Sequence, residues 1–183
     1  MKGLIIVKYL KFLEAEYDYN LVDKVIESSN LPDGGAFTTV GSYHYSQMFN
    51  LVSNTSRITE RTIDDLFFEF GKFIFQAFVI GHSHFFSSAN SSFDVFRSLD
   101  SYIHPEVRKL YPDAELPKFT VEREKGNEMI FVYESARKMS SLASGLIDAC
   151  MIHYDEDGRV DKHNIDNDGE IVRFRIQKNE GPN

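Results

Sequence analysis

The stretch PKFTVEREKGNEMIFVYESAR, residues 117–137, is where the periodicity of the sequence becomes strand-like. Large apolar residues recur there at every second position: Phe119 and Val121, then Met129, Phe131 and Tyr133. A period of two is typical of a strand with one buried face. Lys125-Gly126-Asn127 separates the two runs and has the composition of a tight hairpin turn. The stretch therefore predicts two antiparallel strands.

The C-terminal part of the chain extends this pattern. A helix is expected over about residues 138–153, because apolar residues recur there at helical spacing: Met139, Leu142, Ala143, Leu146, Ile147 and Cys150. Residues 160–165 and 171–176 form a second predicted hairpin across Asp166-Asn-Asp-Gly169. We therefore expect a mostly antiparallel, four-stranded sheet with a helix packed on it.

The part of the chain before residue 117 is predicted to be helical, because its apolar residues recur at spacings of three and four. The expected helices are one from Leu4 to Tyr17, others over about 20–29 and 44–54, a long one capped by Thr59, and one or two over about 93–110. Residues 82–92 are expected to form a polar loop. The long helix is rich in Phe on more than one side, which indicates burial against several neighbours or against a large apolar group. The fold class is therefore α+β, in a single domain over residues 1–183.

Composition limits the classes of function. The chain has 183 residues, 20 Lys and Arg against 28 Asp and Glu, and a net charge of −8. This charge disfavours a duplex nucleic-acid binder and a protein that adheres to an anionic membrane. Cys150 is the only cysteine, so an internal disulfide and a zinc site built on paired cysteines are excluded. We expect no membrane span and no cleaved signal peptide.

Tyr133, Ser135 and Arg137 are the first group that could carry chemistry. On a strand, residues two and four apart project from the same face, so a phenol, a hydroxyl and a guanidinium are expected to converge. Three donors, one of them a permanent cation with a planar fork, suit a pair of carboxylates or a phosphate. The alternative is a solvated strand edge with Arg137 in a surface ion pair.

His104 is a single histidine within an apolar segment. Pro105 follows it, so His104 is expected at a bend or as the cap before a new helical turn. A lone histidine in such a segment is usually a core residue with satisfied ring nitrogens. The alternative is an axial ligand of a haem iron, whose two propionates a Tyr/Ser/Arg trio would bind.

Together, the two motifs resemble those of the H-NOX family, the haem nitric-oxide/oxygen-binding domains related to the haem domain of soluble guanylate cyclase. One motif is Tyr-x-Ser-x-Arg at residues 133–137, and the other is IHPEVRKLYPDAELP at residues 103–117. The resemblance extends from Met1 to about Ile176. It implies a haem b (iron protoporphyrin IX) buried in the fold, with a helical subdomain of about residues 1–60 and a haem-holding α/β subdomain of about residues 61–178.

By this resemblance His104 is the proximal iron ligand, the trio binds the propionates, and Pro117 presses on the porphyrin and distorts it. The residues expected in the distal pocket are Ile5, Tyr9, Ile74, Phe78, Leu142 and Leu146. Leu142 stands where oxygen-binding relatives have a tyrosine donor. The resemblance therefore implies a sensor that binds nitric oxide, and also carbon monoxide. The alternative is an oxygen-binding sensor or a haem enzyme that uses Tyr9 as its distal donor.

The resemblance also implies signalling rather than catalysis, since the expected distal wall offers no His, Asp, Glu or Arg for acid–base chemistry. Release of His104 from the iron would let the haem and the subdomains relax, a two-state change that a partner protein reads. In bacterial relatives that partner is a histidine kinase or a cyclic-di-GMP enzyme. We expect a cytoplasmic protein that binds neither nucleic acid nor membranes. A scaffold that has lost the cofactor is the third possibility.

Overall fold

The structure is a computed structural model that describes residues 1–179, and only the backbone of Asp33. It confirms the predicted α+β class. The elements in chain order are α1 (Gly3–Glu16), α2 (Tyr19–Ser28), a 3₁₀ turn η1 (Pro32–Gly35), α3 (Ser46–Thr59), α4 (Ile63–Gly81), α5 (Ser83–Ser87), α6 (Ser92–Ser98), a π-helical turn η2 (Leu99–Ile103), α7 (His104–Leu110), β1 (Lys118–Lys125), β2 (Glu128–Glu134), α8 (Ser140–His153), β3 (Gly158–Asn164) and β4 (Ile171–Lys178). Within residues 1–179 no helix is long and apolar enough to cross a membrane.

The four strands form one antiparallel sheet in the order β1-β2-β4-β3. Both predicted hairpins are present, and the first turns at Gly126, whose φ is +57°. The alternation in β2 and β4 places one set of side chains in the core: Met129, Phe131 and Tyr133 from β2, and Val172, Phe174 and Ile176 from β4. The sheet therefore buries one face and leaves charged pairs such as Arg173–Glu122 on the other.

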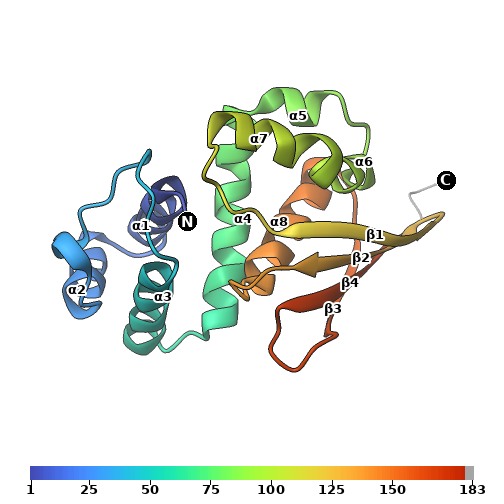
Figure 1. The fold of residues 1–183 in the computed structure, drawn as a ribbon. Helices are drawn as coiled ribbons and strands as arrows, with labels where there is room; N and C mark the ends of the chain where they lie inside the picture. The colour runs from blue at the N-terminus through green and yellow to red at the C-terminus, as the bar shows by residue number, and fades with distance from the viewer. Residues whose placement is uncertain (180–183) are drawn as a thin grey trace.

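The long helix α4 lies between two hydrophobic cores (Figure 1). Leu66, Phe67 and Phe70 pack in the N-terminal core with residues of α1 and α3, whereas Phe75 packs in the C-terminal core with the sheet and α8. Partly buried Phe78 packs against both cores. The excess of Phe in this helix is thus explained by burial on more than one side, as the sequence predicts.

Helices α4 and α8 approach each other very closely where Gly71 faces Gly145. A Cβ at Gly145 would lie 1.9 Å from the Phe68 carbonyl oxygen, and one at Gly71 would lie 2.4 Å from that of Leu142. Both contacts involve backbone atoms, so a side chain at either position requires the helices to separate. The crossing sets the position of Leu142 and Leu146 on α8.

Two local predictions are wrong. Thr59 does not cap α4: it ends α3, where its hydroxyl donates to the Thr55 carbonyl, and Glu60 then takes a left-handed conformation. Thr62 caps α4 by accepting from the Asp65 backbone N–H. Residues 82–92 are not all loop either, because α5 forms there and buries Phe85 and Phe86.

Candidate functional site

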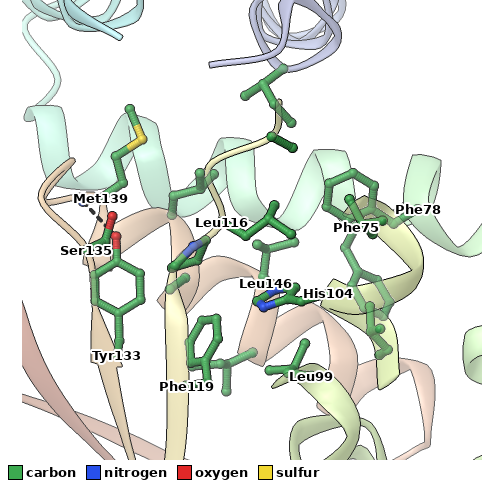
Figure 2. A pocket seen from close by; sticks show the side chains of 18 of the residues that line it. Phe75, Phe78, Leu99, His104, Leu116, Phe119, Tyr133, Ser135, Met139 and Leu146 are labelled. Carbon is green, nitrogen blue, oxygen red and sulfur yellow. Dashed lines mark hydrogen bonds between the residues drawn. The ribbon is translucent and has the colours of Figure 1, made fainter. Parts of the chain in front are cut away.

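A cavity of about 300 Å³ lies between the sheet, α8 and the helices α4 to α7. Apolar side chains dominate its wall, and Figure 2 shows His104 pointing into it across from Tyr133 and Ser135. Met1 and Lys2, which precede α1, and Leu4 and Ile5 in its first turn also contribute to the wall. The cavity thus brings together His104, Pro117 and all three residues of the predicted trio.

His104 is the first residue of α7, and the chain reaches it without a break through the π-helical turn η2. The prediction that a new helical turn starts at Pro105 is confirmed, because Pro105 sits in the first turn of α7, where a missing N–H costs nothing. His104 is not its cap, because its own backbone is helical, with φ −64° and ψ −39°. The imidazole is buried, with 8% of the residue exposed. Its Nδ1 lies 2.8 Å from Asp100 Oδ1, one helical turn earlier.

This contact fixes the chemistry of the ring. Asp100 Oδ2 also accepts from the Phe119 backbone N–H at 2.9 Å, so the carboxylate is anchored to strand β1. Burial lowers the pKa of His104, although Asp100 opposes the shift, and the ring is therefore neutral at pH 7. A neutral imidazole that donates from Nδ1 presents Nε2 as a lone pair, which is the arrangement of a metal-binding histidine.

The trio is not built as the strand argument predicts. Strand β2 ends at Glu134, so Ser135 and Arg137 lie in the turn that leads to α8. Tyr133 Oη accepts from the Met139 backbone N–H at 3.1 Å, and Ser135 Oγ accepts from the Arg137 N–H at 3.2 Å. Both hydroxyls keep their own proton to donate, and burial raises the pKa of Tyr133, which keeps it protonated. Strand β2 therefore directs Tyr133 toward the cavity, whereas the turn directs Ser135 and Arg137 there.

The predicted distal residues divide into two groups. Ile5, Phe78, Leu142 and Leu146 line the cavity. Their side chains carry no hydrogen-bond donor. His82, at the end of α4, also lines the cavity, and burial lowers the pKa of its imidazole.

Tyr9 and Ile74 do not lie on the cavity wall, because both are buried in the N-terminal core. The Tyr9 ring packs edge-on against Phe70 at 5.2 Å between centroids. Its hydroxyl makes no hydrogen bond to any described residue, and the nearby Thr55 hydroxyl donates to the Leu51 carbonyl instead. Burial strongly raises the pKa of this phenol, so it stays protonated, and its O–H is unpaired within the N-terminal core.

Sequence reasoning missed two residues of the site. Asp100 has a readable signal, since a carboxylate four residues before a histidine shares its helix face. Glu115 has none: its contact with Arg137 spans 22 residues and depends on how the loop after α7 folds back over the cavity.

The model of the haem-NO-binding family matches residues 2–162. The chain belongs to this family. Its members are haem-based gas-sensor domains, and the fold is that of an H-NOX domain. Among curated proteins, no sequence matches the chain.

Solved structures show the same architecture. The Fe(II) unliganded H-NOX protein from K. algicida is 34% identical, with a TM-score of 0.95 over 99% of this chain and 98% of that one. The H-NOX from Shewanella woodyi, in the Fe(II)CO state with IWP-051 bound, is also 34% identical, with a TM-score of 0.83 over 98% and 95% of the two chains. The H-NOX protein from S. oneidensis in the Fe(II)NO state is 20% identical and shares the fold, with a TM-score of 0.90 over 98% and 100%.

The residues present fit a haem. The cavity is apolar where a porphyrin needs desolvation, and the neutral His104 imidazole, whose Nδ1 is bonded to Asp100, faces into it. Tyr133 and Arg137 line the same cavity and offer donors to which carboxylates can bind. The donor set is therefore complementary to a haem with one axial histidine.

Proposed function

We propose that this protein is a nitric-oxide sensor that holds a haem b in the cavity and signals to a partner protein. The observation that carries the proposal is the setting of His104. The imidazole is neutral and faces the cavity, and its Nδ1 is hydrogen-bonded to Asp100. A bound haem supplies the iron at which a diatomic gas binds. His104 Nε2 would be its one protein ligand.

Other residues of the cavity would hold and shape the cofactor. Tyr133, Ser135 and Arg137 would donate to its propionates, because charge-assisted hydrogen bonds to carboxylates are strong. Pro117, immediately before β1, lines the same cavity and would press on the macrocycle. Its rigid ring cannot yield as a flexible side chain would.

The proposed preference for nitric oxide over oxygen rests on the apolar wall. Oxygen needs a hydrogen-bond donor when it binds to ferrous iron, since charge moves onto its outer atom. Ile5, Leu142 and Leu146 line the cavity and cannot donate, so the preference requires that His82, which lines the same cavity, does not donate to a bound gas. Nitric oxide, and more weakly carbon monoxide, would bind without that help.

The signal would begin at His104. A displacement of this imidazole would move α7 and, through the Nδ1 contact, Asp100, which is bonded to β1. Because α4 packs in both cores, such a movement can reach the N-terminal helices. The chain would pass this change to a histidine kinase or a cyclic-di-GMP enzyme in a bacterial cytoplasm, without catalysis of its own.

An absorption spectrum tests the cofactor assignment. The chain is expressed with a haem supply, purified and reduced under argon. We expect a Soret band typical of five-coordinate ferrous haem with one histidine ligand, at one haem per chain. A colourless product would mean that the fold serves as a scaffold without cofactor.

Arg137→Ala is expected to speed haem loss more than Ser135→Ala. The first removes a charge-assisted fork, which corresponds to roughly 10- to 100-fold in affinity, and the second removes one neutral donor, which corresponds to roughly 2- to 10-fold. Haem transfer to excess apomyoglobin measures both rates. Arg173→Ala is the matched control, because Arg173 pairs with Glu122 on the outer face of the sheet. Equal and negligible effects of the two cavity variants would remove the trio from the cofactor site.

An oxygen-binding sensor is the second candidate, and the unpaired Tyr9 hydroxyl is the observation that favours it. Tyr9→Phe separates the two functions. If the hydroxyl stays buried without a partner, its removal should stabilise the protein by about 1 kcal/mol and leave gas binding unchanged. If Tyr9 turns toward a bound gas, the variant should lose oxygen affinity or release nitric oxide faster. Thermal unfolding and stopped-flow gas binding measure the two effects, and we expect only the first.

A further inference from the structure

The guanidinium of Arg137 is already engaged by Glu115. Its Nη2 lies 2.5 Å from Glu115 Oε2, and its Nη1 donates to the Glu115 backbone carbonyl at 2.7 Å. Both residues line the cavity. One fork of the arginine is thus occupied by a carboxylate from the chain itself, the same chemical group that a haem propionate would offer.

Glu115 belongs to the loop that connects α7 to β1, residues 111–117. A second attachment holds the same loop: the Asp113 carboxylate accepts from Lys2 Nζ at 3.0 Å and also from the Ser42 hydroxyl. The loop is therefore fixed to the N-terminal part of the chain independently of Glu115. Loss of the Glu115 charge should leave the loop in place.

The two partners of the pair differ in their surroundings. The Glu115 side chain is 82% exposed, whereas that of Arg137 is 15% exposed. The Arg137 guanidinium holds the pKa of the Glu115 carboxyl below its usual value, so Glu115 is ionised at neutral pH. Water can solvate the released carboxylate easily, but Arg137 needs a replacement partner. An exchange of one carboxylate for another satisfies both residues.

We propose that Glu115 is an internal competitor for Arg137 that lowers the affinity of the cavity for haem. This inference rests on the proposed function, because it takes Arg137 as a propionate ligand. The Glu115 backbone carbonyl remains bonded to Nη1 in either arrangement, so only the side chain exchanges. Glu115 thereby sets how readily the cofactor is gained and lost.

Glu115→Gln tests the competition, since glutamine keeps the shape and removes the charge. We expect haem transfer to apomyoglobin to slow about twofold to fivefold, the range for an exposed ion pair. The same substitution in an Arg137→Ala background should have no effect, because no guanidinium remains for Glu115 to occupy. Glu134→Gln is the matched control, since Glu134 is half exposed and pairs with Lys118 on the strand. Faster haem loss in Glu115→Gln, or the same slowing without Arg137, would overturn the inference.

A measurement without haem keeps this test separate from the proposed function. Phenylglyoxal modifies free guanidinium groups, and peptide mass spectrometry reports the rate at Arg137 alone. In the haem-free chain, Glu115→Gln should speed modification of Arg137 about twofold to fivefold and leave Arg173 unchanged. An unchanged rate at Arg137 would show that Glu115 does not occupy it. Failure of the wild-type chain to retain any haem would instead refute the proposed function.

Discussion

His104→Gly is expected to abolish stable haem retention. The substitution removes the cavity-facing imidazole whose Nδ1 is bonded to Asp100, and glycine offers no replacement donor. Added imidazole should restore the haem, because the space left by the side chain accepts the free ligand. The measurement is the ratio of Soret to protein absorbance after gel filtration, with and without imidazole. An imidazole concentration of about 10 mM exceeds the roughly millimolar Kd of a weak small ligand.

His163→Gly is the matched control for this experiment. His163 lies on β3 and is exposed, so its loss should leave the haem content unchanged. A His104→Gly protein that keeps its haem and its spectrum in the absence of imidazole would refute the assignment of the iron ligand.

Gly145→Ala is expected to destabilise the fold by about 2 kcal/mol. The new methyl group would lie 1.9 Å from the Phe68 carbonyl oxygen, so α8 must move away from α4. Overpacking costs about 1–3 kcal/mol, and the better helix propensity of alanine returns less than about 1 kcal/mol. For a chain of this length the loss corresponds to a decrease in Tm of roughly 4–8 °C.

The same displacement should alter the cofactor site, because Leu142 and Leu146 lie on α8 and line the cavity. We therefore expect faster haem loss in Gly145→Ala together with the lower Tm. Gly81→Ala provides the comparison: a Cβ there meets nothing within 4 Å, and Gly81 ends the same helix α4. That variant should be neutral or slightly stabilised. Equal Tm values for the two variants would show that the helix crossing tolerates a side chain.

The sheet and its hairpins follow from the sequence, because each strand buries one face and the alternation of Met129, Phe131 and Tyr133 records it. The helix ends follow less well. Thr59 and Thr62 could each cap α4 with the same hydroxyl group. Because Glu60 adopts a positive φ and ends α3 after Thr59, the cap of α4 is Thr62. The sequence also conceals α5, because a five-residue helix is too short to show periodicity.

The site could be predicted where one short motif carries it. His104 and Arg137 line the cavity, as their motifs predict, whereas the shared strand face expected for Arg137 is wrong because β2 ends at Glu134. Features that depend on tertiary packing could not be read. The contact of Gly71 with Gly145 and the position of Tyr9 behind the cavity wall both depend on how helices cross.

Gas binding to the reduced, haem-loaded protein is the most direct test of the nitric-oxide assignment. Absorption and electron paramagnetic resonance spectra are recorded after addition of nitric oxide under argon and, separately, after exposure to air. The apolar wall of Ile5, Leu142 and Leu146 predicts no stable oxygen complex. If His104 is released when nitric oxide binds, as proposed, the nitrosyl spectrum would show no histidine ligand. A stable oxygen complex in air would contradict the account and place this chain among oxygen-binding sensors.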